Sequence, residues 1–223
     1  MYVTHIYPEL THDQAWHQGW RRSQELTQHD PDEFWLASIA TCYTAGRDLQ
    51  NQQLDEDIDG ISVHRTPRAG GMTYYGPGQL HVCTVFNIER NPQPNFSVRV
   101  LTALTRNLNQ NFGLGQRQPP RFEYSQTDPG IYEISTGNKI ASLGFYQNRG
   151  WLLGGAVINF CVDLAPYNNI APCGVDQRAM GNILSYEANW DRLVSFGDSM
   201  ILHLTQELYH DQQNGISTQG KGK

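Results

Sequence analysis

Apolar positions near the start of the chain follow the spacing of an amphipathic helix. Trp16 and Trp20 lie four residues apart, and Thr11 with Gln14 forms a capping box in which each residue bonds the backbone of the other. These two signals predict a helix over residues 11–28.

Two further helices are predicted later in the chain. The first begins at a cap formed by Ser97, ends at Gly113, and carries four apolar residues on one face: Leu101, Leu104, Leu108 and Phe112. The second begins at Asn189, and its apolar face contains Leu193, Ile201, Leu204 and Leu208. Both therefore have one side suited to packing against a sheet.

Shorter apolar runs predict strands. They cover residues 34–41, 61–63, 80–88, 130–135, 139–147 and 151–164. Turn residues at 136–138 and 148–150 separate the last three runs, which is the pattern of a β-meander. The glycine-rich stretch RAGGMTYYGPG, residues 68–78, is expected to be irregular.

These helices and strands follow one another without repeats or an interdomain linker. A chain of 223 residues with these elements suits one α+β domain, with helices packed against a mainly antiparallel or mixed sheet. We expect the domain to span residues 1–211 and residues 212–223 to form a mobile tail.

Composition excludes some classes of function. The formal net charge is −6, whereas a nucleic-acid surface needs clustered Lys and Arg. No run approaches the roughly 18 apolar residues of a membrane helix, and the N-terminus lacks a basic segment followed by an apolar one. We therefore expect a cytoplasmic protein that binds neither nucleic acid nor membranes.

The four cysteines lack the paired spacing of a metal site. Cys42, Cys83 and Cys161 lie inside apolar runs, where a free cysteine usually acts as a small buried hydrophobe. Cys173 lies in a loop between Pro172 and Gly174, and it is either a tolerated small residue or a nucleophile. No metal and no cofactor are expected.

Two more features have both a structural and a chemical interpretation. The glycine-rich stretch is either a turn or a set of free backbone N–H groups for a carboxyl, phosphate or thioester oxygen. Lys139, after a Gly-Asn turn, is either solvated surface or an ammonium that favours a nearby thiolate. Neither a dinucleotide fingerprint nor a phosphate-binding P-loop is present.

Taken together, four segments resemble the lipoyl (octanoyl) transferase family, in the same order and at similar intervals. They are RAGGMTYYGPGQL (68–80), GIYEISTGNKIASLG (130–144), RGWLLGGAVINFCVDL (149–164) and APCGVDQRAMGNI (171–183). The resemblance covers about residues 34–183. It implies a fold similar to the biotin and lipoate protein ligases.

The resemblance also implies a site and a reaction. Cys173 matches the family's acyl-thioester residue and Lys139 its partner lysine. The acyl site matches Arg68, Ala69, Gly70, Gly71, Met72, Thr73, Tyr74, Tyr75, Ser142, Leu143, Gly144, Gly155, Ala156 and Val157. The implied donor is octanoyl acyl-carrier protein, and the implied acceptor is the lysine of a lipoyl-domain protein such as the glycine cleavage H protein or a 2-oxoacid dehydrogenase E2 subunit.

Two family histidines are absent, because Tyr75 and Gly154 occupy their positions. We expect the Tyr75 ring to fill space left at Gly154, so that Gly154→His clashes with Tyr75. Two alternatives stay open: an ATP-dependent lipoate or biotin ligase, and a non-catalytic paralogue that binds acyl chains or lipoyl domains.

The mechanism that the resemblance implies sets a geometric expectation. Lys139 and Cys173 should converge within about 4 Å at one end of an elongated apolar pocket. The walls of this pocket should include Gly70, Gly71, Ser142 and Gly155.

Overall fold

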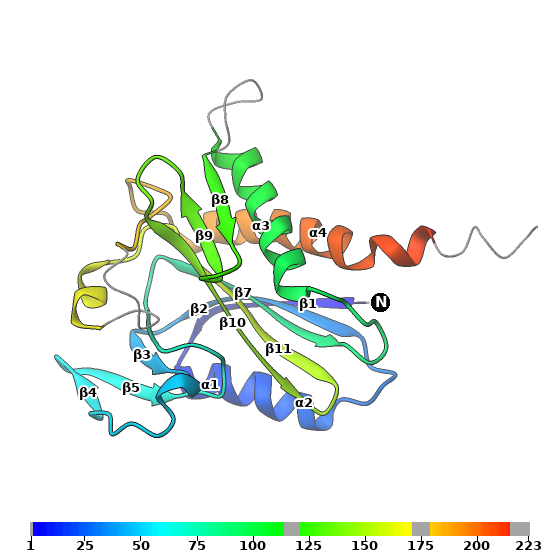
Figure 1. Cartoon of the computed structure of the whole chain (residues 1–223), viewed down its shortest axis with the longest axis horizontal. Helices are drawn as coiled ribbons and strands as arrows, with labels where there is room; N and C mark the ends of the chain where they lie inside the picture. Colours follow the sequence, from blue (N-terminus) through cyan, green and yellow to red (C-terminus); the bar gives the residue numbers. More distant parts are fainter. Residues whose placement is uncertain (1, 114–120, 171–178, 215–223) are drawn as a thin grey trace, which may run out of the picture.

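The computed structural model describes residues 2–113, 121–170 and 179–214, and its centre is a seven-stranded sheet (Figure 1). The strands lie in the order β1 (Tyr2–Leu10), β2 (Asp32–Ile39), β7 (Gln79–Asn87), β11 (Trp151–Asn159), β10 (Lys139–Asn148), β9 (Gly130–Glu133) and β8 (Phe122–Ser125). Only β1 and β2 pair in parallel, so the sheet is mixed. The predicted meander is confirmed, since β9, β10 and β11 are antiparallel neighbours.

Helices cover both faces of this sheet (Figure 1). On one face lie α3 (Phe96–Phe112) and α4 (Trp190–Asn214). On the other lies the N-terminal helical segment, made of α1 (His12–Trp16), a π-helical turn (His17–Arg21) and α2 (Arg22–Glu25). Two short 3₁₀ turns, Arg47–Leu49 and Ala165–Asn169, complete the helical elements of the described residues.

The main core lies between the sheet and the α3/α4 layer. Alternate residues of the central strands point into it, including Leu36 from β2, Val82 and Phe86 from β7, and Ile158 from β11, all fully buried. Leu104 of α3 and Leu204 of α4 meet them from the helix layer. The alternation sends the intervening residues of the same strands to the opposite face, where the candidate site lies.

A smaller sheet stands beside the N-terminal helical segment. Its order is β4 (Asp57–Ile58), β5 (Ile61–Arg65), β3 (Cys42–Ala45) and β6 (Met72–Tyr75). The expectation that residues 68–78 are irregular is therefore wrong for β6, which pairs antiparallel with β3. Aromatic Tyr74 and Tyr75 favour extended backbone and override the flanking glycines.

The helix signals were right about existence and less accurate about limits. Thr11 and Gln14 form the predicted capping box, and Asn189 Oδ1 accepts from Arg192 N at 3.0 Å as expected of a cap. The helix expected over residues 11–28 instead contains a π-helical turn and ends at Glu25.

One of two predicted boundaries needs correction. The predicted cap at Ser97 is wrong, because α3 begins at Phe96 after Asn95, whose left-handed backbone (φ 58°) turns the chain into the helix. The expected domain over residues 1–211 and mobile tail over 212–223 stay a prediction; α4 continues to Asn214, and residues 215–223 lie outside the described part of the chain.

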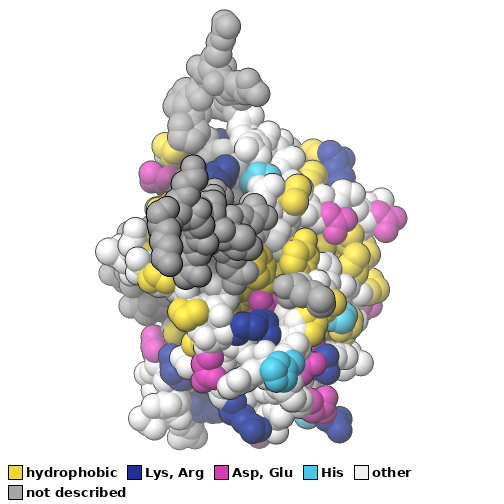
Figure 2. All heavy atoms as spheres, turned by 90° about the vertical axis from the view of Figure 1, so that its right-hand side faces the viewer, with side chains coloured by type: hydrophobic (Ala, Val, Ile, Leu, Met, Phe, Trp, Pro, Cys, Tyr) yellow, Lys and Arg dark blue, Asp and Glu magenta, His cyan; other side chains and the backbone are white. Residues whose placement is uncertain are grey.

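Surface features add two observations. No helix among the described residues is long and apolar enough to cross a membrane. On the face shown in Figure 2, acidic and basic side chains are interspersed rather than gathered by sign.

Candidate active site

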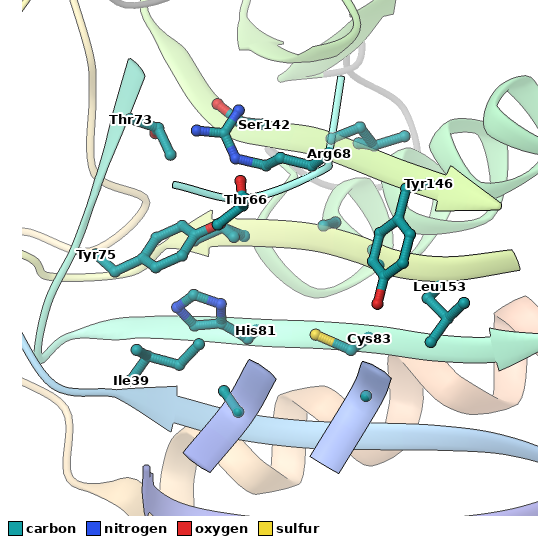
Figure 3. Close-up of a pocket in the computed structure, with 18 of the residues that line it drawn as sticks. Ile39, Thr66, Arg68, Thr73, Tyr75, His81, Cys83, Ser142, Tyr146 and Leu153 are labelled. Carbon is teal, nitrogen blue, oxygen red and sulfur yellow. The ribbon is translucent and has the colours of Figure 1, made fainter. Parts of the chain in front are cut away.

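A cavity of about 190 Å³ lies on the sheet face opposite α3 and α4. The large sheet forms its floor, and the N-terminal helical segment, β6 and the loop after β5 form its walls (Figure 3). Its lining includes residues far apart in sequence, among them His12, Trp16, Arg68, Tyr75, His81, Asp128, Lys139, Ser142, Tyr146 and Leu153. Tertiary folding alone brings these residues together.

Strand register orders the floor into three rows that run across β10, β11, β7 and β2. The first row is Ser142, Val157, His81 and Ala37; the second is Gly144, Gly155, Cys83 and Trp35; the third begins with Tyr146, Leu153 and Val85. The second row has no side chains at Gly144 and Gly155, whereas the third row carries the bulky side chains of Tyr146 and Leu153. The floor is therefore a trough that bulky apolar residues close at one end.

Lys139 enters the cavity because of a β-bulge. Lys139 pairs with Tyr132 and Ala141 with Ile131, so the register slips by one residue at Ile140. Ile140 and Ala141 consequently both face the helix-side core, and Lys139 shares the cavity face with Ser142. The bulge aims this lysine inward.

Asp128 holds the Lys139 ammonium. Lys139 Nζ lies 2.7 Å from Asp128 Oδ1, and the lysine side chain is only 5% exposed. The other carboxylate oxygen, Oδ2, accepts a 2.6 Å hydrogen bond from the Tyr132 hydroxyl. Because the lysine side chain is buried against this carboxylate, the interpretation of Lys139 as solvated surface is wrong.

Gly130 makes this arrangement possible. A Cβ at Gly130 would lie 2.4 Å from Lys139 Cε and 3.2 Å from Nζ, so the lysine chain crosses β9 where a side chain is missing. Asp128 and Gly130 belong to one short segment, Asp-Pro-Gly, and both serve Lys139. The sequence offered no signal for Asp128, because its role depends on the bulge in a different strand.

Arg68 is held against the small sheet. Its Nη2 donates to Thr44 O at 2.7 Å and to Thr44 Oγ1 at 2.9 Å, while Nη1 donates to Ala69 O at 3.1 Å. These bonds fix the guanidinium above the floor, near Ser142 in Figure 3. Arg68 thus adds a positioned positive charge to the cavity wall.

His81 and Tyr75 are neighbours in the cavity. Their rings pack edge to face with centroids 4.6 Å apart, and His81 Nε2 is buried without a hydrogen-bond partner among the described residues. Burial lowers the pKa of His81 to about 3 and raises that of Tyr75, although Arg68 acts against the latter shift. Both side chains are therefore neutral near pH 7.

The structure explains the glycine at position 154 by backbone geometry rather than by compensation from Tyr75. Gly154 has φ +116°, and a Cβ there would lie 2.1 Å from the carbonyl oxygen of Gly144. It pairs with Phe145 and alternates to the helix side of the sheet. A side chain at position 154 would therefore meet the backbone of β10, so the clash predicted with Tyr75 is wrong.

The structure divides the implied acyl-site residues into two groups. Eleven line the cavity: Arg68, Ala69, Gly70, Thr73, Tyr75, Ser142, Leu143, Gly144, Gly155, Ala156 and Val157. Gly71, Met72 and Tyr74 do not, and Tyr74 packs instead with Tyr43, Val162 and Tyr167. Sequence reasoning missed Asp128, Tyr132, His81 and the aromatic residues Trp16, Trp35 and Tyr146.

Cys173 lies outside the described residues, so its predicted distance to Lys139 stays a prediction. The chain that follows it is described. Lys139 N donates to Ala179 O at 3.0 Å, and Gly181 N donates to Lys139 O at 2.9 Å. Both main-chain groups of Lys139 thus bond the chain that begins six residues after Cys173.

The base of the segment 163–181 is tied together. Val162 N donates to Asn182 Oδ1 at 3.1 Å, and Asn182 Nδ2 donates to Val162 O at 2.8 Å. Leu184 N donates to Phe160 O at 2.9 Å just beyond this pair. We call the Val162–Asn182 pair the loop clasp.

One group among the described residues has the composition of a metal site: His12, Asp13 and His64, with ligand atoms within 4.8 Å of one another. The His12 and His64 rings are stacked, with centroids 4.3 Å apart and planes 20° apart. Stacked imidazoles direct their in-plane lone pairs side by side rather than at one point. As placed, the pair is a ring stack, and only His12 of the two lines the cavity.

These features match a known family of acyl-transferring and ligating enzymes. Residues 17–196 match the model of the lipoyl protein ligase A/B catalytic domain, and the chain belongs to this family. An octanoyltransferase from Actinobacillus succinogenes is 31% identical over 186 residues, which cover 79% of this chain and 82% of that protein. The chain is thus an acyltransferase related to the octanoyltransferases, as the sequence resemblance predicted.

Solved structures agree on the fold. A crystal structure of lipoate-protein ligase A bound with ATP superposes with a TM-score of 0.69 at 15% identity, covering 94% of this chain and 86% of that one. A biotin protein ligase from Aquifex aeolicus gives 0.53 at 10% identity, with 96% and 72% coverage. The predicted α+β fold, similar to the biotin and lipoate protein ligases, is confirmed.

Proposed function

We propose that the chain transfers an octanoyl group from the thioester of an acyl-carrier protein to the lysine of a lipoyl domain, through a thioester on Cys173. The observation that carries this proposal is the buried Lys139–Asp128 pair at one end of an apolar trough. The octanoyltransferase relatives support the same reaction.

The trough suits a hydrocarbon chain. Its floor presents glycines and neutral side chains, and each methylene removed from water contributes roughly 0.8 kcal/mol. Lys139, Asp128 and Ser142 gather at one end, where the polar thioester belongs. At the other end, Tyr146 and Leu153 offer bulky and mainly apolar surface to the tail, and Tyr146 adds one hydroxyl.

Cys173 is the proposed nucleophile partly because two of the other cysteines, Cys42 and Cys83, are poor ones. Burial raises the pKa of both Cys42 and Cys83 to about 12, which leaves them as thiols. Cys161 Sγ accepts a hydrogen bond from Ala188 N at 3.4 Å. The main chain of Lys139 bonds Ala179 and Gly181, which follow Cys173 in the sequence.

The first proposed step forms the acyl-enzyme. The Cys173 thiolate attacks the octanoyl carbonyl, a new C–S bond forms, and the bond to the pantetheine sulfur breaks. The leaving thiolate takes a proton from the Lys139 ammonium, which Asp128 holds in place. Free pantetheine thiol and a neutral Lys139 amine result.

In the second proposed step, the amine of the acceptor lysine attacks the Cys173 thioester. The C–N bond forms, the Cys173 thiolate leaves, and the nitrogen's surplus proton passes to Lys139, which restores the starting state. Because a thioester donor is already activated, no ATP is needed. The proposed acceptors are the glycine cleavage H protein or a 2-oxoacid dehydrogenase E2 subunit.

Intact-mass spectrometry after mixing the protein with octanoyl acyl-carrier protein tests the proposal. We expect one octanoyl mass on the parent, removed by hydroxylamine and absent from Cys173→Ser. Cys161→Ser is the matched control and should be acylated normally. A hydroxylamine-labile thioester that persists on another cysteine in Cys173→Ser contradicts the assignment of the nucleophile.

Two reactions separate the alternatives. Acylation of a lipoyl domain from free octanoate and ATP, without the carrier thioester, would favour a ligase. Binding of octanoate with neither reaction would favour the non-catalytic paralogue.

A further inference from the structure

The N-terminal helical segment crosses the closed end of the trough, away from Lys139. Trp16 and Gly19 line the cavity there together with Tyr146, Leu153 and Trp35. The Trp16 and Tyr146 rings lie 5.7 Å apart between centroids. Figure 3 shows Tyr146 and Leu153 together at the opposite end of the view from Tyr75 and Thr73.

Gly19 leaves space at this end. A Cβ at Gly19 would meet Trp35 Cζ3 at 3.8 Å and Leu153 Cδ2 at 3.9 Å, which are ordinary van der Waals distances. Packing therefore does not require a glycine here, and a glycine inside a helix weakens the helix relative to alanine. Gly19 also lies in the π-helical turn His17–Arg21, an irregularity that is frequent at functional sites.

The length of the trough fits a medium acyl chain. Ser142 and Tyr146 are four residues apart on β10, so the first and third rows are separated by roughly 13 Å at the usual rise of a strand. Van der Waals contact between the last carbon of the acyl chain and the closed end of the trough takes up about 4 Å of this distance. The remaining length of roughly 9 Å holds about seven carbons, each advancing roughly 1.3 Å at ordinary bond lengths.

We propose that Gly19 and Leu153 determine the acyl-chain length: the methyl end of the chain rests in the space beside Gly19, with Leu153, Trp16 and Tyr146 as the stop. This inference rests on the proposed function for the identity of the chain. It makes the N-terminal helical segment, which is far in sequence from Lys139, the specificity-determining element.

Gly19→Ala and Leu153→Ala test the stop in opposite directions. The alanine methyl at position 19 shortens the space without touching backbone, so we expect preference to move from octanoyl toward hexanoyl by about 10-fold, since each lost methylene contact costs about fourfold in affinity. Leu153→Ala lengthens the space and should raise decanoyl and dodecanoyl use relative to octanoyl. Leu153→Val is the milder variant if the alanine protein does not fold.

Gln18→Ala is the matched control, because Gln18 is exposed, adjacent to Gly19 and outside the cavity. Two measurements are made on each protein: transfer rates from hexanoyl, octanoyl, decanoyl and dodecanoyl carrier thioesters, and calorimetric binding of the corresponding free fatty acids. The chain-length order in binding does not depend on turnover. If the chain-length order in binding shifts as expected while no thioester reacts, the proposed role of Gly19 and Leu153 is supported and the proposed transfer fails. If Gly19→Ala keeps the parent's chain-length order in both binding and transfer, the proposed role is overturned.

Discussion

The two faces of the seven-stranded sheet are built from the same strands but serve opposite purposes. On the helix side, β2 and β7 present Phe34, Leu36 and Phe86, all fully buried against α3 and α4. On the cavity side, the same strands present Ala37, His81 and Cys83. Large residues at one set of alternate positions fill a core, whereas Ala37, His81 and Cys83 at the other set border a hollow together with Trp35.

This difference indicates that the stability of the fold depends mainly on the helix side of the sheet and the proposed reaction on the cavity side. Interiors are close-packed, so removing atoms from the helix side leaves a void, whereas the cavity side already contains one. Substitutions on the two faces should therefore separate effects on folding from effects on the reaction.

The largest expected effect comes from Phe86→Ala on the helix side. Phe86 is fully buried, and its ring packs against that of Phe96 with centroids 5.1 Å apart, so its truncation should cost about 3–5 kcal/mol of unfolding free energy. Cys83→Ala on the cavity side of the same strand is the comparison and should cost less than about 1.5 kcal/mol. Urea unfolding monitored by circular dichroism measures both, and equal losses would erase the distinction between the faces.

Lys139→Ala should affect the reaction most on the cavity side. Loss of a positioned acid/base group should slow transfer by about 100-fold, equivalent to about 2.7 kcal/mol in the barrier. Asp128→Asn removes the carboxylate that holds this ammonium and should also slow transfer. Steady-state rates at several pH values test this; a Lys139→Ala rate within a few-fold of the parent excludes the proposed role.

Gly154→Ala should sharpen the comparison at the backbone. Its φ of +116° and the 2.1 Å approach of a Cβ to Gly144 O predict a loss of about 1–3 kcal/mol. Gly19→Ala, where the same methyl has room, serves as the stability control. Thermal unfolding of both variants distinguishes the sites, and an unchanged midpoint for Gly154→Ala would refute the steric argument.

The smallest effect concerns acid sensitivity. The pKa of His81 is about 3 in the fold and near 6.5 in the unfolded chain. Between these two values only the unfolded chain binds the proton, so the free energy of unfolding decreases as the pH is lowered. His81→Phe should therefore lose about 1 kcal/mol less than the parent between pH 6.5 and 5.5. Urea unfolding at both pH values measures this difference, with the exposed His29→Gln as control; parallel losses in His81→Phe and the parent would contradict it.

Local signals in the sequence predicted much of the fold. The Thr11 capping box, the Asn189 cap and the apolar runs of β2, β7, β10 and β11 all depend on neighbouring residues, which a single sequence displays. β1 was missed because its residues are mostly exposed and its register comes from parallel pairing with β2. β6 was missed because glycines on either side suggested a loop.

The site could be predicted only in part, for a related reason. The family resemblance pointed to Lys139 and to the glycines of the trough, but the partner of Lys139 is set by a bulge and by the passage over Gly130. In the sequence, His81 looks like any histidine of a strand and Gly19 like any glycine of a helix. They line one cavity only once the sheet and the N-terminal helical segment have come together. Their relation to the cavity exists only in three dimensions.

The loop clasp has a thermodynamic consequence. Val162 and Asn182 join the ends of a 19-residue segment, 163–181, by two side-chain hydrogen bonds, so the cost of bringing those ends together is met when the chain folds. Lys139, bonded to Ala179 and Gly181, anchors the same segment to the sheet. The described ends of the segment are therefore already joined before any substrate binds, so binding there does not have to bear the entropic cost of bringing them together.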